Sequence, residues 1–221
     1  MLVLIKGAGD LATGTAVRLY RAGIKVVMTE VARPTAVRRT VAFSQCMYDG
    51  AAQVEGISAR RAEDAGAARR ALERGEVPVL CDPEAAILRE LPFDGVVDAI
   101  LAKRNLGTAI TDAPVVLALG PGFTAGVDCH GVVETMRGHD LGRLLTRGSA
   151  VPNTGVPGDV GGYTTQRIIR APADGVFEPL AAIGQRVEEG QPVARVAGRP
   201  APSSPAWCGG CSPPGWPSRR A

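Results

Sequence analysis

The chain has 221 residues, enough for one large domain or for a medium-sized and a small one. Hydrophobic residues make up 45% and charged residues 21%, so the chain can bury an aliphatic core and keep a hydrated surface. The net charge is only +3, and the arginines are scattered rather than clustered with aromatic residues, which argues against a nucleic-acid partner.

The amino-terminal apolar stretch is too short for a membrane span or for the hydrophobic part of a signal peptide. It runs from Met1 to Ile5 and ends at Lys6. We therefore expect a cytoplasmic protein without a membrane partner. The five cysteines lack the paired spacing of a disulfide framework, and the composition leaves association into a homo-oligomer open.

The first 30 residues predict a strand, a helix and a second strand. Residues 2–5 are apolar, residues 11–22 repeat apolar side chains with helical spacing, and residues 24–30 are typical of another strand. A Gly-x-Gly turn joins the first strand to the helix. This order is typical of a Rossmann-type α/β domain with a parallel sheet.

The Gly-x-Gly turn has the residues of a phosphate-binding loop. Gly7 permits a tight turn, Gly9 lets the backbone approach a phosphate, and Ala12 takes the small third position of the G-x-G-x-x-G/A pattern. The N–H groups that open the helix attract an anion. Glu30, which lies 21 residues after Gly9, is expected to accept ribose hydroxyls and would favour NAD over NADP.

Asp10 weakens the simplest form of this hypothesis. A carboxylate inside the loop repels phosphate unless it caps the helix. A ligand other than a dinucleotide therefore remains an alternative. A tight turn that binds no ligand is another.

Strands and helices alternate through the middle of the chain. We expect helices over 62–74 and 82–91, and strands over 77–81, 95–100 and 115–119. This alternation predicts a parallel, doubly wound sheet, whose ligands bind at the carboxyl ends of the strands.

Several later residues are candidates for this crevice. Asp82 and Asp98 follow strands, as Glu30 does, although a helix cap is the better explanation for Asp82. Lys103 and Arg104 are expected to contact phosphate or carboxylate, with a solvated loop as the alternative.

A second Gly-rich turn contains Gly120 and Gly122. Between them Pro121 removes an N–H donor, which weakens a phosphate-binding role. Close approach to a ligand or to another strand explains these glycines equally well.

His130 is the candidate for proton transfer, with a hydrogen-bonded structural role as the alternative. If residues 127–135 form a strand, then Asp128, His130 and Glu134 share one face. Their spacing matches no closed zinc signature, so we predict no metal site.

The carboxyl-terminal third predicts a separate, smaller part. Residues 1–148 form the predicted cofactor-binding domain, and residues 149–163 a Gly- and Pro-rich linker. Residues 164–200 resemble half of a biotinyl/lipoyl barrel-sandwich module. The carrier lysine is missing, so we expect the module to be structural.

Residues 201–221 depart from this pattern because they are rich in Pro, Ser, Trp and Cys. A shifted reading frame would turn most of them into apolar residues. We interpret this tail as the product of a frameshift near residue 200 and expect it to be disordered. The pair Cys208 and Cys211 is then no zinc or redox site.

Taken together, these stretches resemble the YqeB family, described as selenium-dependent molybdenum hydroxylase maturation proteins. The resemblance extends from residue 1 to about residue 198. The matching stretches are residues 7–14, 28–30, 33–39, 98–105, 119–139 and 153–155.

The resemblance implies an accessory factor for a molybdenum hydroxylase apoenzyme, related in role to XdhC-like proteins. Such a factor handles a nucleotide-bearing cofactor of the molybdopterin type, whose phosphate would suit the predicted loop. The resemblance carries over no catalytic residue. The alternative is an NAD-dependent oxidoreductase that uses the same turn, with His130 as the proton-transfer group.

Overall fold

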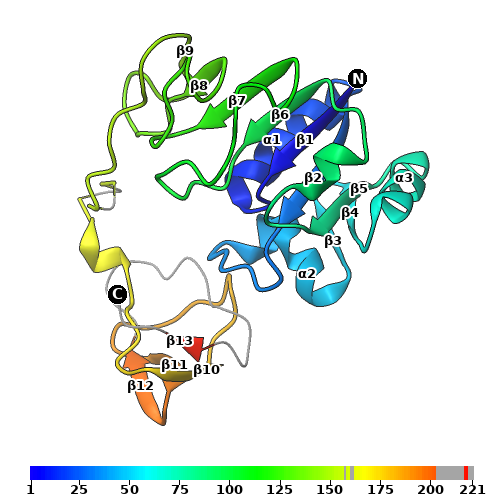
Figure 1. Cartoon of the computed structure of the whole chain (residues 1–221). Helices are drawn as coiled ribbons and strands as arrows, with labels where there is room; N and C mark the ends of the chain where they lie inside the picture. Colours follow the sequence, from blue (N-terminus) through cyan, green and yellow to red (C-terminus); the bar gives the residue numbers. More distant parts are fainter. Residues whose placement is uncertain (157, 160–161, 203–216, 219–221) are drawn as a thin grey trace. The chain divides into compact units, whose positions relative to one another are not determined.

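The computed structural model describes residues 1–156, 158–159, 162–202 and 217–218. The chain divides into two compact units (Figure 1). The first comprises residues 1–34 and 39–153, and the second comprises residues 35–38 and the chain from residue 154 onwards. The division after Asn153 falls inside the segment predicted as a linker.

The described residues of the first unit form a nine-stranded sheet in the order β3-β4-β5-β2-β1-β6-β7-β8-β9. Neighbouring strands from β4 to β8 in this order run parallel, and only the edge strands β3 and β9 pair antiparallel. The predicted α/β class with a mostly parallel sheet is confirmed. The strands are β1 (Leu2–Lys6), β2 (Lys25–Glu30), β3 (Ala51–Val54), β4 (Ile57–Ala62), β5 (Val77–Cys81), β6 (Gly95–Asp98), β7 (Val115–Leu119), β8 (Gly131–Val133) and β9 (Leu144–Leu145).

Two βαβ units supply four of the nine strands of this sheet. Helix α1 (Asp10–Arg21) joins β1 to β2, and helix α3 (Ala65–Glu73) joins β4 to β5. The helices cover opposite faces of the sheet: α1 packs with Val3 and Ile5, whereas α3 packs with Leu4. Successive side chains of β1 point to opposite faces, so both faces are buried under apolar side chains.

The shorter helices are single turns. They are η1 (Arg39–Val41), η2 (Phe43–Gln45), α2 (Cys46–Asp49) and η3 (Ala86–Arg89). Within the part of the chain that the structure describes, no helix has the length and apolar character needed to cross a membrane.

The helix predicted over 82–91 is wrong in type and extent, because the chain there makes only the turn η3. Ala85 adopts a left-handed conformation with φ of 53°. The Asp82 carboxylate accepts hydrogen bonds from the N–H groups of Ala86 and Ile87, both at 2.9 Å. Asp82 thus closes a tight turn, in line with the capping role that the sequence favoured.

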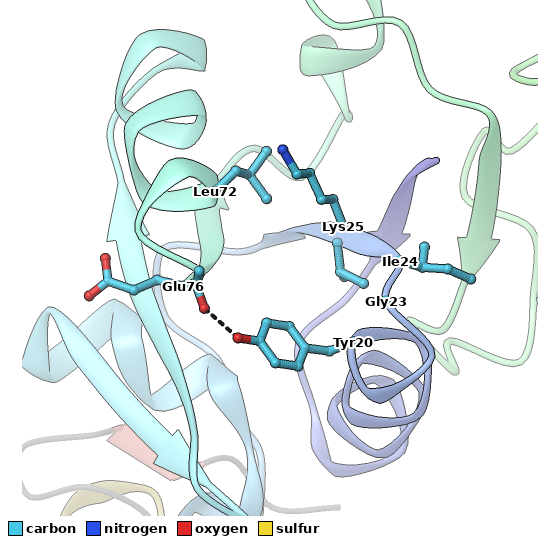
Figure 2. A pocket seen from close by; sticks show the side chains of 8 residues that line it. Tyr20, Gly23, Ile24, Lys25, Leu72 and Glu76 are labelled. Carbon is cyan, nitrogen blue, oxygen red and sulfur yellow. Dashed lines mark hydrogen bonds between the residues drawn. The ribbon is translucent and has the colours of Figure 1, made fainter.

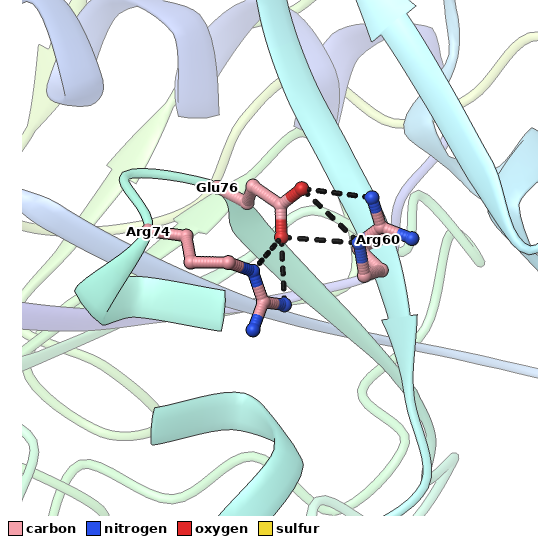
Figure 3. A network of polar contacts seen from close by, with 3 residues as sticks. All are labelled: Arg60, Arg74 and Glu76. Carbon is pink, nitrogen blue, oxygen red and sulfur yellow. Dashed lines mark hydrogen bonds and ion pairs between the residues drawn. The ribbon is translucent and has the colours of Figure 1, made fainter. Parts of the chain in front are cut away.

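The βαβ unit around α3 is fastened by a three-residue polar network (Figure 3). Arg60 of β4 binds the Glu76 carboxylate at 2.9 to 3.1 Å, and Arg74 binds the same carboxylate at 2.8 Å. The hydrogen bonds from Arg60, and then from Arg74, hold the pKa of Glu76 below its usual value of 4.5. This network ties β4 to the turn between α3 and β5.

The second unit contains a small antiparallel sheet in the order β12-β11-β10-β13. Its elements are η4 (Thr165–Arg167), β10 (Gly175–Pro179), β11 (Pro192–Val196), β12 (Arg199–Pro202) and β13 (Pro217–Ser218). The barrel-sandwich module stays a prediction. Most of the tail from residue 201, on which the frameshift hypothesis rests, lies outside the described residues.

Candidate functional site

The strand order reverses on either side of β1. The chain passes from β1 to β2 on one side, and later returns to place β6 on the other. Ligands of open α/β sheets bind outside the carboxyl ends of the strands at such a switch point. Glu30, Asp82 and Asp98 all stand at this carboxyl edge, at or directly after the ends of β2, β5 and β6.

Contacts within the protein require a glycine at position 7. Its φ is +93°, and a Cβ atom there would lie 3.0 Å from the carbonyl oxygen of Ala99. The N–H of Gly7 donates to the Thr29 carbonyl oxygen at 2.8 Å. The first glycine therefore makes the tight turn and lets the loop pack against the segment after β6.

Gly9 is not required in this way. Its φ of −64° and ψ of −178° suit any residue, and no protein atom lies within 4 Å of the position that its Cβ would take. Gly9 is the N-cap of α1 and has no side chain with which to cap the helix. Asp10 is the first helical residue, not the cap, and Ala12 is fully buried in the core.

The Glu30 carboxylate is already engaged with the main chain. It accepts hydrogen bonds from the N–H of Ala8 at 2.9 Å and from the N–H of Val31 at 2.8 Å. Burial raises the pKa of Glu30, and these two bonds oppose that shift. One loop N–H is therefore occupied by the carboxylate that was predicted to contact a ribose.

Lys6 is a site residue that sequence reasoning missed. It ends β1, directly before Gly7, and is only 2% exposed. Its ammonium donates to Thr108 Oγ1 at 2.6 Å, and that hydroxyl donates to Asp98 Oδ2 at 2.6 Å. A charged residue at the end of an apolar strand was the available signal, but its partner Thr108 lies 102 residues away in the chain.

The loop after β6 carries Lys103 and Arg104 to the surface at this edge, and both are exposed. Its backbone is strained, because Leu101 and Lys103 adopt positive φ values of 60° and 63°. Such conformations persist only where surrounding contacts hold them, and they are concentrated at functional sites. Asn105 helps to hold the loop by accepting the N–H of Thr108 at 2.8 Å.

The second Gly-rich turn packs against neighbouring protein. A Cβ at Gly120 would lie 2.6 Å from Thr135 Oγ1. A Cβ at Gly122 would lie 2.5 Å from the main-chain nitrogen of Arg104. Of the two explanations left open by the sequence, close approach of protein segments accounts for both glycines. This turn supports the loop that presents Arg104.

A curated protein of Escherichia coli (strain K12), "Uncharacterized protein YqeB", is 54% identical to this chain over 193 residues, which are 87% of the chain. The chain belongs to the YqeB family. It spans 36% of the length of that relative. No family model matches the chain, and no solved structure matches it.

In this member of the YqeB family, His130 is separated from the Gly7–Gly9 loop. Strand register aligns Lys6 with Asp98, Ala118 and Val132. His130 therefore lies three strands away, about 14 Å across the sheet, and two residues back toward the amino ends. Its Nδ1 accepts the N–H of Val116 at 3.0 Å, so His130 extends the pairing of β7 with β8.

The strand considered over 127–135 is short. It covers only Gly131–Val133, so Asp128 and Glu134 fall outside it and share no strand face with His130. Asp128 instead accepts the N–H of Thr124 at 2.7 Å. Among the residues described, no group of His, Cys, Asp and Glu is placed to hold a metal ion.

Glu134 is a buried hydrogen-bond acceptor. Its carboxylate accepts N–H groups from Thr135, Met136 and Val151 at 2.7 to 2.8 Å. Burial alone would raise the pKa of Glu134, but these three bonds outweigh it and hold the pKa below 4.5. The side chain is a structural anchor for the segment that leaves the sheet.

A separate hollow of about 300 Å³ lies at the opposite, amino edge of the sheet (Figure 2). It is bounded by the end of α1, the start of β2 and the end of α3. The Tyr20 hydroxyl donates to the Gly75 carbonyl oxygen at 2.7 Å across it. The predicted site residues are absent from its lining.

Proposed function

We propose that the carboxyl-edge crevice binds the phosphate of a nucleotide-bearing cofactor of the molybdopterin type. On this proposal the chain acts as an accessory factor that matures a molybdenum hydroxylase, in a role like that of XdhC-like proteins. The observation that carries the binding proposal is Gly9, a glycine that neither its backbone conformation nor its protein neighbours require. Open space before a loop glycine is what close approach of a phosphate needs.

The first turn of α1 supports an anionic ligand. The helix has 12 residues, and its N-cap residue, Gly9, provides no capping side chain. Such a terminus carries a partial positive charge and directed donors. The Glu30 carboxylate is turned toward the N–H groups of Ala8 and Val31, which donate to it at 2.9 and 2.8 Å.

The cofactor type and the hydroxylase partner come from the family resemblance. The alternative is an NAD-dependent oxidoreductase with His130 as the proton-transfer group. His130 lies about 14 Å across the sheet from the loop, too far to transfer a proton to a ligand bound there. The accessory role is therefore the stronger candidate.

Calorimetric titration with NAD(H), NADP(H) and molybdopterin cytosine dinucleotide tests the binding proposal. We expect wild-type protein to bind the molybdopterin dinucleotide. We expect Gly9→Ala to weaken that binding at least about tenfold with only a small loss in Tm, because alanine fits the backbone, is a somewhat poorer N-cap than glycine, and fills the space for the ligand.

The matched control is Gly14→Ala, one turn further along α1, where the Cβ position is equally open. This variant should bind as wild type does. Equal affinity of Gly9→Ala and wild type, or no binding of any of these ligands, would contradict the proposal. Pulldown of a hydroxylase apoenzyme would support the accessory role, whereas turnover of NADH with a small carbonyl substrate would support the oxidoreductase.

A further inference from the structure

Arg39 contains a buried polar atom without a partner. Among the side chains that the structure describes, its Nε is the buried nitrogen or oxygen that makes no hydrogen bond. Native proteins rarely leave such a group unsatisfied, and an ion that binds there is one of the recognised reasons. The resting side chain therefore pays a desolvation cost that a ligand can relieve.

The segment that contains this arginine is held against the Gly7–Gly9 loop. Arg39 opens η1, which contacts both α1 and β3 and precedes η2. Within η2, the N–H of Phe43 donates to Thr13 Oγ1 at 2.9 Å, and the N–H of Ser44 donates to the Ala8 carbonyl oxygen at 2.8 Å. The segment that begins at Arg39 is thereby fixed to the loop and to the first turn of α1.

The segment that contains Arg39 is basic, whereas the loop itself carries the carboxylates of Glu30 and Asp10. Between Glu30 and Asp49 the sequence contains three arginines and no acidic residue. No ion pair of Arg39 occurs within the described part of the chain. A guanidinium presents a planar fork of N–H donors, which matches two oxygens of a phosphate better than the single ammonium of a lysine does.

We propose that Arg39 is the side chain that recognises the anion at the Gly7–Gly9 loop, and that the group it recognises is a phosphate or pyrophosphate. This inference rests on the proposed function and names the residue that completes its site. Main-chain N–H groups of α1 take some of the phosphate oxygens, and the Arg39 guanidinium turns from its unsatisfied position to take others.

The proposal predicts effects of opposite sign on stability and on binding. Arg39→Met keeps the apolar stem of the side chain and removes the guanidinium. Because the buried Nε is unsatisfied, the ligand-free variant should have a Tm equal to or above that of wild type. An arginine retained for structural reasons would lower Tm when it is removed.

Calorimetric titration with inorganic pyrophosphate and with ADP, together with thermal unfolding without ligand, tests this inference. We expect Arg39→Met to bind both probes about 10- to 100-fold more weakly than wild type. The affinity of Arg39→Lys should lie between those of wild type and Arg39→Met. The matched control is Arg18→Met at the far end of α1, where the side chain is exposed. This control should bind as wild type does.

The possible outcomes separate the two proposals. Equal binding by Arg39→Met and wild type, alongside weaker binding by Gly9→Ala, overturns the role of Arg39 alone. A folding failure or a lowered Tm of ligand-free Arg39→Met also overturns it, because the guanidinium would then be structural. If wild-type protein binds neither probe and also binds no dinucleotide, both proposals fail.

Discussion

The two βαβ units of the sheet share one architecture and differ at the point where the helix begins. In one, β4 ends in the buried Ala62 and the chain enters α3 through Asp64. In the other, β1 ends in the buried Lys6 and the chain enters α1 through Gly9. The Asp64 side chain accepts the N–H of Ala67 at 2.6 Å, whereas the N-cap of α1, Gly9, has no side chain that could do so.

The two helices therefore differ in capping. The N-cap side chain of α3 accepts an N–H group of the first turn, whereas the N-cap of α1 has no side chain to do so. The start of α3 lies toward the edge of the sheet, and the start of α1 lies at the central switch point. A helix gives up free energy when it lacks a cap. We infer that α1 forgoes a side-chain cap so that its N–H groups stay available to a ligand.

The largest expected effect comes from the buried lysine beneath the open loop. Lys6→Met removes the buried ammonium that donates to Thr108, which in turn donates to Asp98, so the free energy of unfolding should fall by about 1–3 kcal/mol. Urea unfolding measures this loss. The double variant Lys6→Met/Asp98→Asn should recover part of it, and a loss below about 1 kcal/mol in the single variant would show that Lys6 carries little of the stability.

Removal of the cap from α3 comes next. Asp64→Ala should lower the free energy of unfolding by about 1 kcal/mol, because the N–H of Ala67 loses its acceptor. The same variant should bind pyrophosphate exactly as tightly as wild type does. Weakened binding would mean that α3 shares the anion site, and would break the contrast between the two helices.

The polar network at the end of α3 gives a smaller, pH-dependent effect. The pKa of Glu76 is lowered in the folded protein, so its stabilising contribution is present above its usual pKa and is lost as pH falls through the folded value. We expect Glu76→Gln to flatten the acid side of the Tm–pH profile. Glu134 acts in the same direction, so some acid dependence should remain. An unchanged profile would contradict this role of Glu76.

The smallest expected effect on stability comes from adding a capping side chain to α1. Gly9→Ser supplies a capping hydroxyl at a position whose backbone already has N-cap geometry. Tm should rise slightly, by a few tenths of a kcal/mol in stability, while binding of pyrophosphate is lost. A variant that gains stability and retains binding would show that the missing cap has no connection with a ligand.

The local pattern of the sequence was sufficient for the first βαβ unit. The apolar run, the Gly-x-Gly turn and the helical spacing correctly predicted β1, α1 and β2, and the end of β2 was placed at Glu30. These signals lie within 30 consecutive residues. They also placed Glu30, Asp82 and Asp98 at one edge of the sheet, because the strands are parallel.

Contacts between distant segments were beyond the reach of these patterns. The link from Lys6 to Thr108 spans 102 residues, and the unsatisfied Nε of Arg39 is defined only once η1 has packed. The predicted helix over 82–91 failed because Asp82 and Ala85 fold the chain into a tight turn. The strand considered over 127–135 is confined to Gly131–Val133, because Asp128 and Glu134 accept N–H groups of the turns on either side.

Amide chemical shifts during a titration with pyrophosphate test the central claim most directly. Each helix start reports separately, through Gly9 and Leu11 for α1 and through Gly66 and Ala67 for α3. Our account predicts large, saturable shifts at the start of α1 and none at the start of α3. Shifts at α3 that equal those at α1, or no shifts at either start, would contradict it.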